Sequence, residues 1–351
     1  MRRRMLVPSL AIAVLLILPL AGCGIGKDTG SKVTPKPDKI EIEKDKGKST
    51  SDKAAKSGEA ADTVTRTLYL FDENGHVTPQ SLNLPNAKTP AEEVLKYLVK
   101  DGPASTSLPD GFQAVLPAGT TFKLNLQDDG TLVADFSKQF LNYRAQDEEK
   151  MLQAVTWTLT QFDNIKRVKF KVGGKELAEM PEAKTPIPKE GLSRADGINT
   201  DLGNVVDITG SRSVVVYYLA ENADGEAYYV PVSKRVKSGD DPLTAAVDAL
   251  INSDPSDPTL ASPFDADVEL VSRPVVKNGV ATLDFNEQLY TDAKKKIVSD
   301  EAVNCLALTL TGLTDVKKVA IEVKGNARMT LESGKPLTEP VSRPVVNKTG
   351  I

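Results

Sequence analysis

The order of apolar and polar positions along the chain occurs twice. Residues 89–99 and 241–251 each carry apolar side chains at helical spacing on one face. Both segments begin with a capping residue followed by proline, which is favoured at the first position of a helix. Thr89 and Glu92 also have the spacing of a capping box. We therefore predict one amphipathic helix at the same place in each half of the chain.

After each helix the pattern changes to strand-like alternation. Residues 122–136 alternate around Asp128-Asp129-Gly130, and the segment that begins at Val268 and Leu270 alternates around Asn278-Gly279. Each pattern predicts a β-hairpin. The other elements also form pairs: opening strands at 68–71 and 214–219, edge strands near 81–84 and 228–232, second helices at 152–162 and 303–313, and closing strands at 165–172 and 316–323.

The paired elements predict an α+β fold in two copies. An amphipathic helix cannot bury its apolar face alone, so we expect both helices of a repeat to pack on one face of a mixed sheet. This gives two tandem α/β sandwich domains at residues 64–180 and 213–332, joined by a linker at 181–212 and followed by a C-terminal tail at 333–351. A ferredoxin-like split arrangement has nearly the same order of elements and is the alternative topology.

The first residues predict an export signal that is not part of the fold. Three arginines at residues 2–4 precede an apolar run at 5–20, which is short for a membrane span of about 20 residues. The run ends in Leu20-Ala21-Gly22-Cys23, which resembles the processing box of bacterial lipoproteins. That resemblance implies a signal peptide at 1–22, a lipid anchor on Cys23, and a mature chain on the extracytoplasmic face of the cell membrane. An uncleaved signal anchor is the alternative.

Residues 23–63 contain the anchor cysteine and a predicted disordered tether. The tether has few large apolar side chains, so it cannot offset the entropy that ordering would cost. Its lysines are balanced by acidic residues, which disfavours a polybasic contact with the membrane.

Composition excludes several kinds of site and partner. The chain has 44 basic and 48 acidic residues and only 5% aromatic residues, so nucleic acid is not an expected partner. One histidine and two cysteines are too few for a Cys/His zinc site, for haem held by two histidines, or for a Ser-His-Asp triad in each half. We therefore expect no metal, no cofactor and no enzymatic activity.

The candidate polar residues fit structural roles. His76 lies in a turn-like run, and we expect it to be exposed. Asp135 and Asp284 occupy the same place in the two halves, each before a Phe, so we interpret them as acceptors for backbone N–H groups and not as an acid–base pair. The following acids lack the order of a calcium loop, and we interpret them as helix caps and turns: Asp240, Asp241, Asp254, Asp257, Asp265 and Asp267.

Four further features have structural interpretations. Cys305 lies beside an apolar stripe and is predicted to be buried and inert. Trp157 fits either the edge of the core or an interface anchor. Gly173-Gly174-Lys175 lacks the spacing of a phosphate loop and predicts a hairpin. The tail segment 341–346 duplicates residues 271–276, by coincidence or as a replica of an edge strand, and we hypothesise that the tail adds to a sheet edge in its own or a neighbouring molecule.

Several motifs resemble the GerM (GerMN) domain family. They are the helix–hairpin–helix–strand unit, the string Leu116-Pro117-Ala118-Gly119-Thr120, the Asp-Phe-Ser and Asp-Phe-Asn steps, and the run 158–162 that enters Val-x-Phe-x-Val. The resemblance covers nearly all of the predicted mature chain except the tether, the linker and the tail. It implies a fold similar to the ring-building motif. The second repeat lacks the Leu-Pro-x-Gly-Thr string near residues 262–267, so equal partner surfaces are not implied.

The resemblance also implies a function. We expect a membrane-anchored, non-catalytic lipoprotein that makes protein–protein contacts in the envelope complex between mother cell and forespore and contributes to spore germination. Its expected partners are other sporulation envelope proteins, with self-association as a further contact. The alternative is a lipoprotein that binds a small ligand or a cell-wall glycan between its two domains. A deep interdomain pocket would favour that alternative, and exposed sheet edges with apolar patches would favour assembly.

Overall fold

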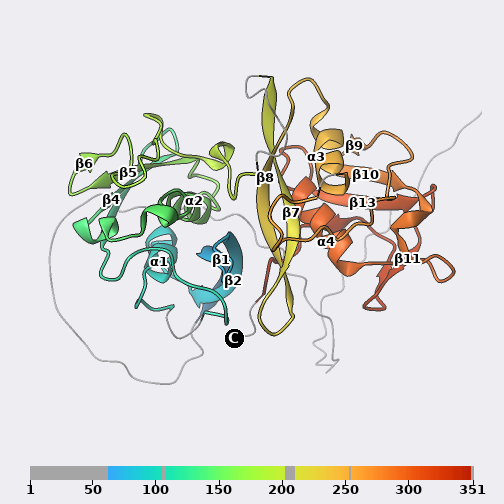
Figure 1. Ribbon diagram of the computed structural model, residues 1–351, viewed down its shortest axis with the longest axis horizontal. Helices are drawn as coiled ribbons and strands as arrows, with labels where there is room; N and C mark the ends of the chain where they lie inside the picture. The colour runs from blue at the N-terminus through green and yellow to red at the C-terminus, as the bar shows by residue number, and fades with distance from the viewer. Residues whose placement is uncertain (1–61, 105–107, 202–209, 253, 349–351) are drawn as a thin grey trace, which may run out of the picture. The chain divides into compact units, whose positions relative to one another are not determined.

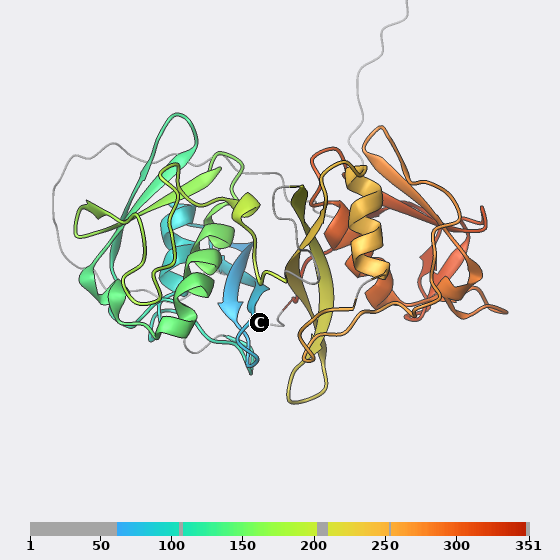
Figure 2. The same cartoon turned by 45° about the horizontal axis from the view of Figure 1, so that its top comes forward.

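The computed structural model describes residues 62–104, 108–201, 210–252 and 254–348 (Figures 1 and 2). The predicted signal, Cys23 and nearly all of the tether lie outside them. The elements of the first repeat are β1 (Thr63–Phe71), β2 (Val77–Pro85), α1 (Pro90–Tyr97), β3 (Phe122–Leu126), β4 (Thr131–Phe136), the 3₁₀ helices η1 (Lys138–Leu141) and η2 (Ala145–Asp147), α2 (Glu148–Leu159), β5 (Arg167–Val172) and β6 (Lys175–Glu176).

The second repeat follows the same order. Its elements are β7 (Ser211–Glu221), β8 (Ala227–Lys237), α3 (Pro242–Ile251), β9 (Val275–Lys277), β10 (Val280–Phe285), η4 (Glu287–Leu289), β11 (Tyr290–Asp292), β12 (Ile297–Val298), α4 (Asp300–Leu310), β13 (Lys318–Val323), β14 (Met329–Leu331), β15 (Pro336–Leu337) and β16 (Val341–Ser342). The short 3₁₀ helix η3 (Arg194–Asp196) lies in the segment between the two repeats.

Each repeat contains an antiparallel hairpin and a four-stranded mixed sheet. The hairpins are β1-β2 and β7-β8, and the mixed sheets have the orders β3-β4-β5-β6 and β16-β13-β10-β9. The central pairs β4-β5 and β10-β13 are parallel, and the other pairs of these sheets are antiparallel. The second repeat adds a small sheet of order β11-β12-β14-β15.

The second helix of each repeat packs against both the hairpin and the mixed sheet, and the first helix packs on the hairpin and on the second helix. Helix α2 contacts β1, β2 and β5, and α4 contacts β7 and β13. Figure 1 shows α3 and α4 between the β7-β8 hairpin and strands β10 and β13. Because both sides are covered, α2 is buried from Met151 to Leu159, as expected for a helix that is mostly apolar or small all round.

The predicted α+β class and the duplication are therefore confirmed. The opening and edge strands, however, do not join the mixed sheet as the pattern predicted. They form hairpins of their own on the other side of the helices. Periodicity shows that a strand has a buried face, but it does not show which sheet buries that face.

Two local predictions were wrong. The first strand of the second hairpin is residues 275–277, and Leu270 makes only a single bridge, to Phe285. Pro274 lies between the two pairings, where this strand has two residues more than β10 has from Thr282 to Phe285, so the register is broken there. Thr89 and Glu92 do not form a capping box, because the Thr89 hydroxyl donates to the Glu92 carboxylate at 3.1 Å and does not cap a backbone N–H.

The segment that follows each repeat returns to the edge of that repeat's mixed sheet. Leu192 forms an antiparallel bridge with Val168, and Val341 pairs antiparallel with Val319. The hypothesis that the tail adds to a sheet edge is thus confirmed for its own repeat. The predicted linker is also packed on the first repeat up to residue 201, with Ile198 fully buried.

An arginine in each of these segments contacts the end of the second helix. Arg194 donates to the carbonyl oxygen of Trp157 at 3.3 Å, and Arg343 donates to that of Leu308 at 2.6 Å. A cation at a helix C-terminus interacts favourably with the exposed carbonyl groups. The duplication therefore extends beyond the predicted domain ends.

Candidate functional site

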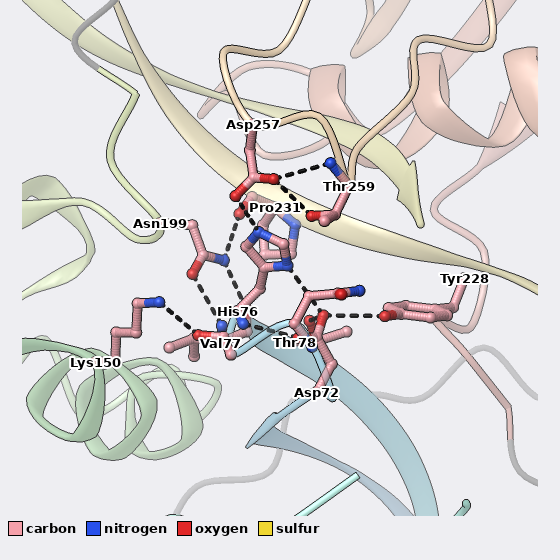
Figure 3. A network of polar contacts seen from close by, with 12 residues as sticks. Asp72, His76, Val77, Thr78, Lys150, Asn199, Tyr228, Pro231, Asp257 and Thr259 are labelled. Atoms are coloured by element: carbon pink, nitrogen blue, oxygen red, sulfur yellow. Dashed lines mark hydrogen bonds and ion pairs between the residues drawn. The ribbon is translucent and has the colours of Figure 1, made fainter. Parts of the chain in front are cut away.

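The first part of the candidate site is Asn199, which connects strands of the two repeats. Its Nδ2 donates to the carbonyl oxygens of Val77 in β2 and Pro231 in β8, each at 2.8 Å. Its Oδ1 accepts the Val77 N–H at 2.8 Å (Figure 3). The backbone of Asn199 has φ 44°, a left-handed conformation that asparagine tolerates better than most residues. The end of the first repeat thus binds both hairpins.

Asn347 in the tail makes a second connection between the hairpins. Its Nδ2 donates to the carbonyl oxygens of Pro79 in β2 at 2.8 Å and Tyr229 in β8 at 3.0 Å. Its Oδ1 accepts the Tyr229 N–H at 2.8 Å, and its own carbonyl oxygen accepts the Ser81 N–H at 3.3 Å. The tail therefore reaches from the second repeat to the first.

A buried charged cluster lies beside Asn199. Asp72, at the end of β1, accepts the backbone N–H of His76 at 2.8 Å and contacts the His76 ring at Nδ1 at 3.2 Å. The hydroxyls of Thr78 and Tyr228 donate to the same carboxylate at 3.0 and 3.1 Å. Because Tyr228 belongs to β8, Asp72 also connects the two repeats. Figure 3 shows these side chains converging between β2 and β8.

The second ring nitrogen of His76 contacts the other repeat directly. Nε2 lies 3.0 Å from Oδ2 of Asp257, whose Oδ1 accepts the N–H and the hydroxyl of Thr259. His76 is only 5% exposed, so the predicted exposed turn histidine was wrong. The turn is as predicted, but β8 and the loop at Asp257 cover it.

Electrostatics favour the charged forms of His76 and Asp257. Burial of the His76 ring opposes protonation, but hydrogen bonds and charges from Asp72 and Asp257 outweigh it and raise the pKa of His76. Burial of the Asp257 carboxylate opposes its ionisation and raises its pKa, but hydrogen bonds from Thr259 and His76 outweigh burial and lower the pKa to about 2. The ring and the Asp257 carboxylate form an ion pair when His76 is protonated.

A cavity of about 610 Å³ opens next to the cluster. It is lined by groups from both repeats, including His76, Lys150, Gln153, Asp201, Ser256 and Asp257. These groups already have partners in the protein. Lys150 donates to the Gly75 carbonyl oxygen at 2.6 Å, and Asp201 pairs with Ser256 and Lys234. The lining is therefore polar but internally satisfied.

The exposed large apolar side chains lie away from this cavity, in the two segments of identical sequence at 271–276 and 341–346. In the described part of the chain, the exposed large apolar residues are Val271 at 54%, Val275 at 64%, Val276 at 38% and Val345 at 53%. All of them belong to segments 271–276 and 341–346, which have the same sequence. These segments lie at opposite edges of one sheet, since β9 and β16 are its outer strands.

Comparison with known proteins gives one match to each of the two repeats. A family model described as "Germane: Sporulation and spore germination" matches residues 67–178 and 215–328. The chain is 44% identical over 349 residues to the spore germination protein GerM of Bacillus subtilis (strain 168), and the match covers 95% of each chain. The chain belongs to the Germane family.

A solved structure shows the same tandem arrangement in a Germane relative. It contains the tandem GerMN domains of the sporulation protein GerM from Bacillus subtilis, and this chain is 47% identical to it with a TM-score of 0.75. The match covers 83% of this chain and 100% of that chain. The resemblance seen in the sequence motifs is therefore confirmed, and the chain is a sporulation and spore germination family member with two GerMN domains.

The paired aspartates have the predicted role in both Germane repeats. Oδ1 of Asp135 accepts the N–H of Gly174, and Oδ1 of Asp284 accepts the N–H of Gly325, each at 2.9 Å. Gly174 has φ 82° and lies in the turn between β5 and β6, so the predicted hairpin at 173–175 is also confirmed. Each aspartate fixes the turn after its closing strand.

Other candidates in the Germane repeats are also structural. Cys305 is fully buried, and burial raises the pKa of its thiol well above the usual value. Trp157 is 3% exposed and donates to the Gly197 carbonyl oxygen, which places it at the core edge. Asp241 caps α3 by accepting the Thr244 N–H. Among the described residues, no cluster of three or more His, Cys, Asp or Glu side chains is arranged to hold a metal ion.

The residues that join the two Germane repeats were not found from sequence. His76 and Asp257 lie 181 residues apart, and no local pattern relates them. Asn199 and Asn347 each follow a Ser-Arg step by a few residues, at 193–194 and 342–343, and this was the available signal.

Proposed function

We propose that this Germane protein is a membrane-anchored, non-catalytic envelope lipoprotein. It acts through protein–protein contacts in the sporulation complex that connects mother cell and forespore, and it contributes to spore germination. Its membership of the sporulation and spore germination family supports the biological setting. The two GerMN domains provide the protein-binding surfaces.

The single observation that carries the proposal is the exposed apolar edge of the second repeat. Soluble proteins rarely leave contiguous large apolar side chains exposed unless they bind something. Val271, Val275 and Val276 are exposed at or beside β9, and Val345 in the tail is the fourth exposed large apolar residue of the described chain.

The predicted lipid anchor supports the location. The box that ends in Cys23 favours acylation there and a mature chain at the extracytoplasmic face of the cell membrane. Several acyl chains hold a protein on a bilayer more firmly than one chain can. No helix in the described residues has the length and hydropathy needed to cross a membrane.

The environment of the reactive residue types supports a non-catalytic role. Both ring nitrogens of His76 are occupied by carboxylates, so neither can take a proton from a substrate. The Cys305 thiol is buried and its raised pKa keeps it protonated, which is the opposite of an activated nucleophile.

A second candidate function is binding of a small ligand or a cell-wall glycan between the repeats. The cavity of about 610 Å³ beside His76 favours it, because its volume is typical of ligand sites. The lining groups, however, are hydrogen-bonded to each other, so a polar ligand would have to replace existing bonds. This comparison favours protein binding.

The test is chemical crosslinking in sporulating cells, with the full chain and with Cys23→Ala. We expect the unaltered chain in the membrane fraction with specific protein adducts, and we expect Cys23→Ala to lose both. Recovery of the unaltered chain as a soluble protein without adducts would contradict the proposal. Membrane recovery without adducts, together with saturable binding of cell-wall fragments, would favour the second candidate.

A further inference from the structure

We infer that the β9 edge, residues 271–278 of the second repeat, binds an extended acidic segment of a partner protein. The inference rests on the proposed protein-binding function and adds the surface and the chemistry of the partner.

The exposed apolar character belongs to the second repeat and not to its counterpart. Val275 pairs with Thr282 in β10, and the matching position in the first repeat is Asn125, which pairs with Val133 in β4. Asp135 and Asp284 fix this equivalence, because each lies two residues after the paired position on its strand. Duplication has thus placed valine where the other copy has a polar side chain.

The β9 strand is open on one side. It is the last strand of the order β16-β13-β10-β9, and within the described residues its only partner is β10. Lys277 and Val280 flank the two-residue turn Asn278-Gly279 and form the closing pair of the hairpin. Hydrogen-bonded and non-hydrogen-bonded pairs alternate along an antiparallel ladder. The next residue, Val276, therefore has its backbone N–H and carbonyl groups facing away from β10. An added strand can bond to this residue, and its side chains then lie opposite Val275 on the face of Lys277 and opposite Val276 on the other face.

Charge selects the chemistry of that strand. Arg273 and Lys277 are the charged residues of segment 271–278, and both are exposed. Val280 pairs with Lys277 on one side and with Lys318 on the other, so the two lysines lie on the same face of the sheet. Val275 lies on this face too, because it pairs with Thr282, two residues along β10 from Val280. Opposite charges across neighbouring strands are favourable, so a segment with an acidic residue opposite Lys277 and an apolar residue opposite Val275 matches this edge.

The same charges make a second copy of this chain a poor occupant. Two β9 strands paired antiparallel around Val275 would place Lys277 opposite Arg273 of the other molecule. Like charges opposite each other destabilise a sheet, and Pro274 offers no N–H to a neighbouring strand. Lysine and proline are common protections against self-pairing of edges. The occupant is therefore a different protein.

The first test measures binding of two labelled synthetic peptides to the full-length lipoprotein in detergent by fluorescence anisotropy. One peptide contains Glu-Val-Val-Val-Glu, which can place Val opposite Val275 and Glu opposite Lys277 and Arg273, and the other has Lys at both Glu positions. We expect the acidic peptide to bind about tenfold more tightly than the basic one. Val275→Asn, which copies the first repeat, and Lys277→Glu should each weaken acidic-peptide binding about fivefold or more.

A matched charge reversal on the first repeat is the control. Lys123→Glu changes an exposed lysine in β3, the equivalent edge strand, and should leave acidic-peptide binding unchanged. Equal binding of the two peptides, or an equal loss with Lys123→Glu, would overturn the inference. Circular dichroism of Val275→Asn checks that the fold is intact.

A second experiment separates this inference from the proposed function. A photocrosslinking amino acid is placed at position 275, 125 or 224 of the full chain in sporulating cells. Protein adducts at 275 that disappear with Lys277→Glu would support the edge. Adducts at 125 or 224 but none at 275 would overturn the edge and leave the protein-binding function in place. No protein adduct at any position would count against both.

Discussion

Asn199 and Asn347 make the same set of hydrogen bonds with the two repeats exchanged. Asn199 bonds to the N–H and carbonyl of Val77 in β2 and to Pro231 in β8. Asn347 bonds to the N–H and carbonyl of Tyr229 in β8 and to Pro79 in β2. Both residues have φ 44°. The junction between the repeats is therefore a product of the duplication, with each repeat's trailing segment holding the hairpin of the other.

Substitution of Asn347 should weaken this junction in two separable ways. Asn347→Gly removes three side-chain hydrogen bonds but accepts a positive φ, and we expect a loss of about 1.5–3 kcal/mol in the free energy of unfolding. Asn347→Ala should lose about 1 kcal/mol more, because a Cβ is unfavourable in the left-handed region. Urea unfolding of both variants measures the difference. Equal stability of the unaltered chain and Asn347→Gly would contradict the role of the hydrogen bonds.

Sequence patterns predicted the parts of the fold that depend on local spacing. Helices, the Asn-Gly and Asp-Gly turns and the roles of Asp135 and Asp284 follow from periodicity and from the comparison of the two halves. The repeated Asp-Phe step is recognisable because the same constraint acts twice at the same place.

The junction could not be predicted in this way. Its contacts join residues that are far apart in sequence, such as Asp72 with Tyr228 and His76 with Asp257. A pattern of polar residues in a turn predicts exposure, and His76 is buried because β2 packs near β8. The prediction that β1 and β2 join the mixed sheet was wrong for the same reason, because tertiary contacts decide which layer covers a strand.

Stability should depend on pH through His76, the only histidine of the chain. Its folded pKa is raised, so protonation favours the folded state. The contribution is complete below about pH 6.5, the usual unfolded value, and is lost as pH rises through the folded pKa. His76→Gln should lower the free energy of unfolding by an amount on the order of 1 kcal/mol at pH 5.5 and by less at pH 8.5. Asp257 is ionised at both pH values, so the change in this difference reports on His76.

Unfolding curves between pH 5.5 and 8.5 measure this dependence. The difference in unfolding free energy between the unaltered chain and His76→Gln should shrink as pH rises. A difference that is constant over this range would show that the ring acts by packing alone.

Glu148 should be required in its charged form. It is fully buried at the start of α2, and its carboxylate accepts the N–H groups of Glu182, Ala183 and Thr185 and the Tyr143 hydroxyl at 2.7–3.0 Å. Burial opposes ionisation, but these bonds lower the pKa to about 2. Glu148→Gln should cost about 2–3 kcal/mol above pH 5, measured by urea unfolding.

The effect of Glu148→Gln should disappear in acid. A depressed carboxylate pKa contributes stability above the unfolded value and loses it as pH falls from about 4.5 towards 2. Glu149→Gln is the neighbouring control, because the Glu149 carboxylate accepts a hydrogen bond from the Gln153 side chain at 3.0 Å and does not bind the backbone N–H groups that Glu148 holds. An equal loss in both variants would contradict a specific role of Glu148.

Cys305 should behave as a small apolar side chain. It is buried in α4 at the position that Ala154 occupies in α2, and both are fully covered. Cys305→Ala should therefore cost less than about 1.5 kcal/mol. Cys305→Ser should cost about 1–3 kcal/mol more, because it buries a hydroxyl without a matched partner. A thiol reagent should react only after unfolding; rapid reaction of the native protein would contradict burial.

Removal of the whole tail should destabilise the protein, whereas removal of the last three residues should not. A chain that ends at residue 332 lacks β15, β16, the buried Val346 and Asn347, so it loses an edge strand and the second connection between the hairpins. Burial of one aliphatic side chain contributes about 1.5–3 kcal/mol, and the lost hydrogen bonds add to it. We expect a marked drop in the urea midpoint and faster proteolysis near β8. A chain that ends at residue 348 keeps all of these contacts and is the matched control. Equal midpoints for the two truncated chains would contradict the view that the tail completes the second repeat and holds the first.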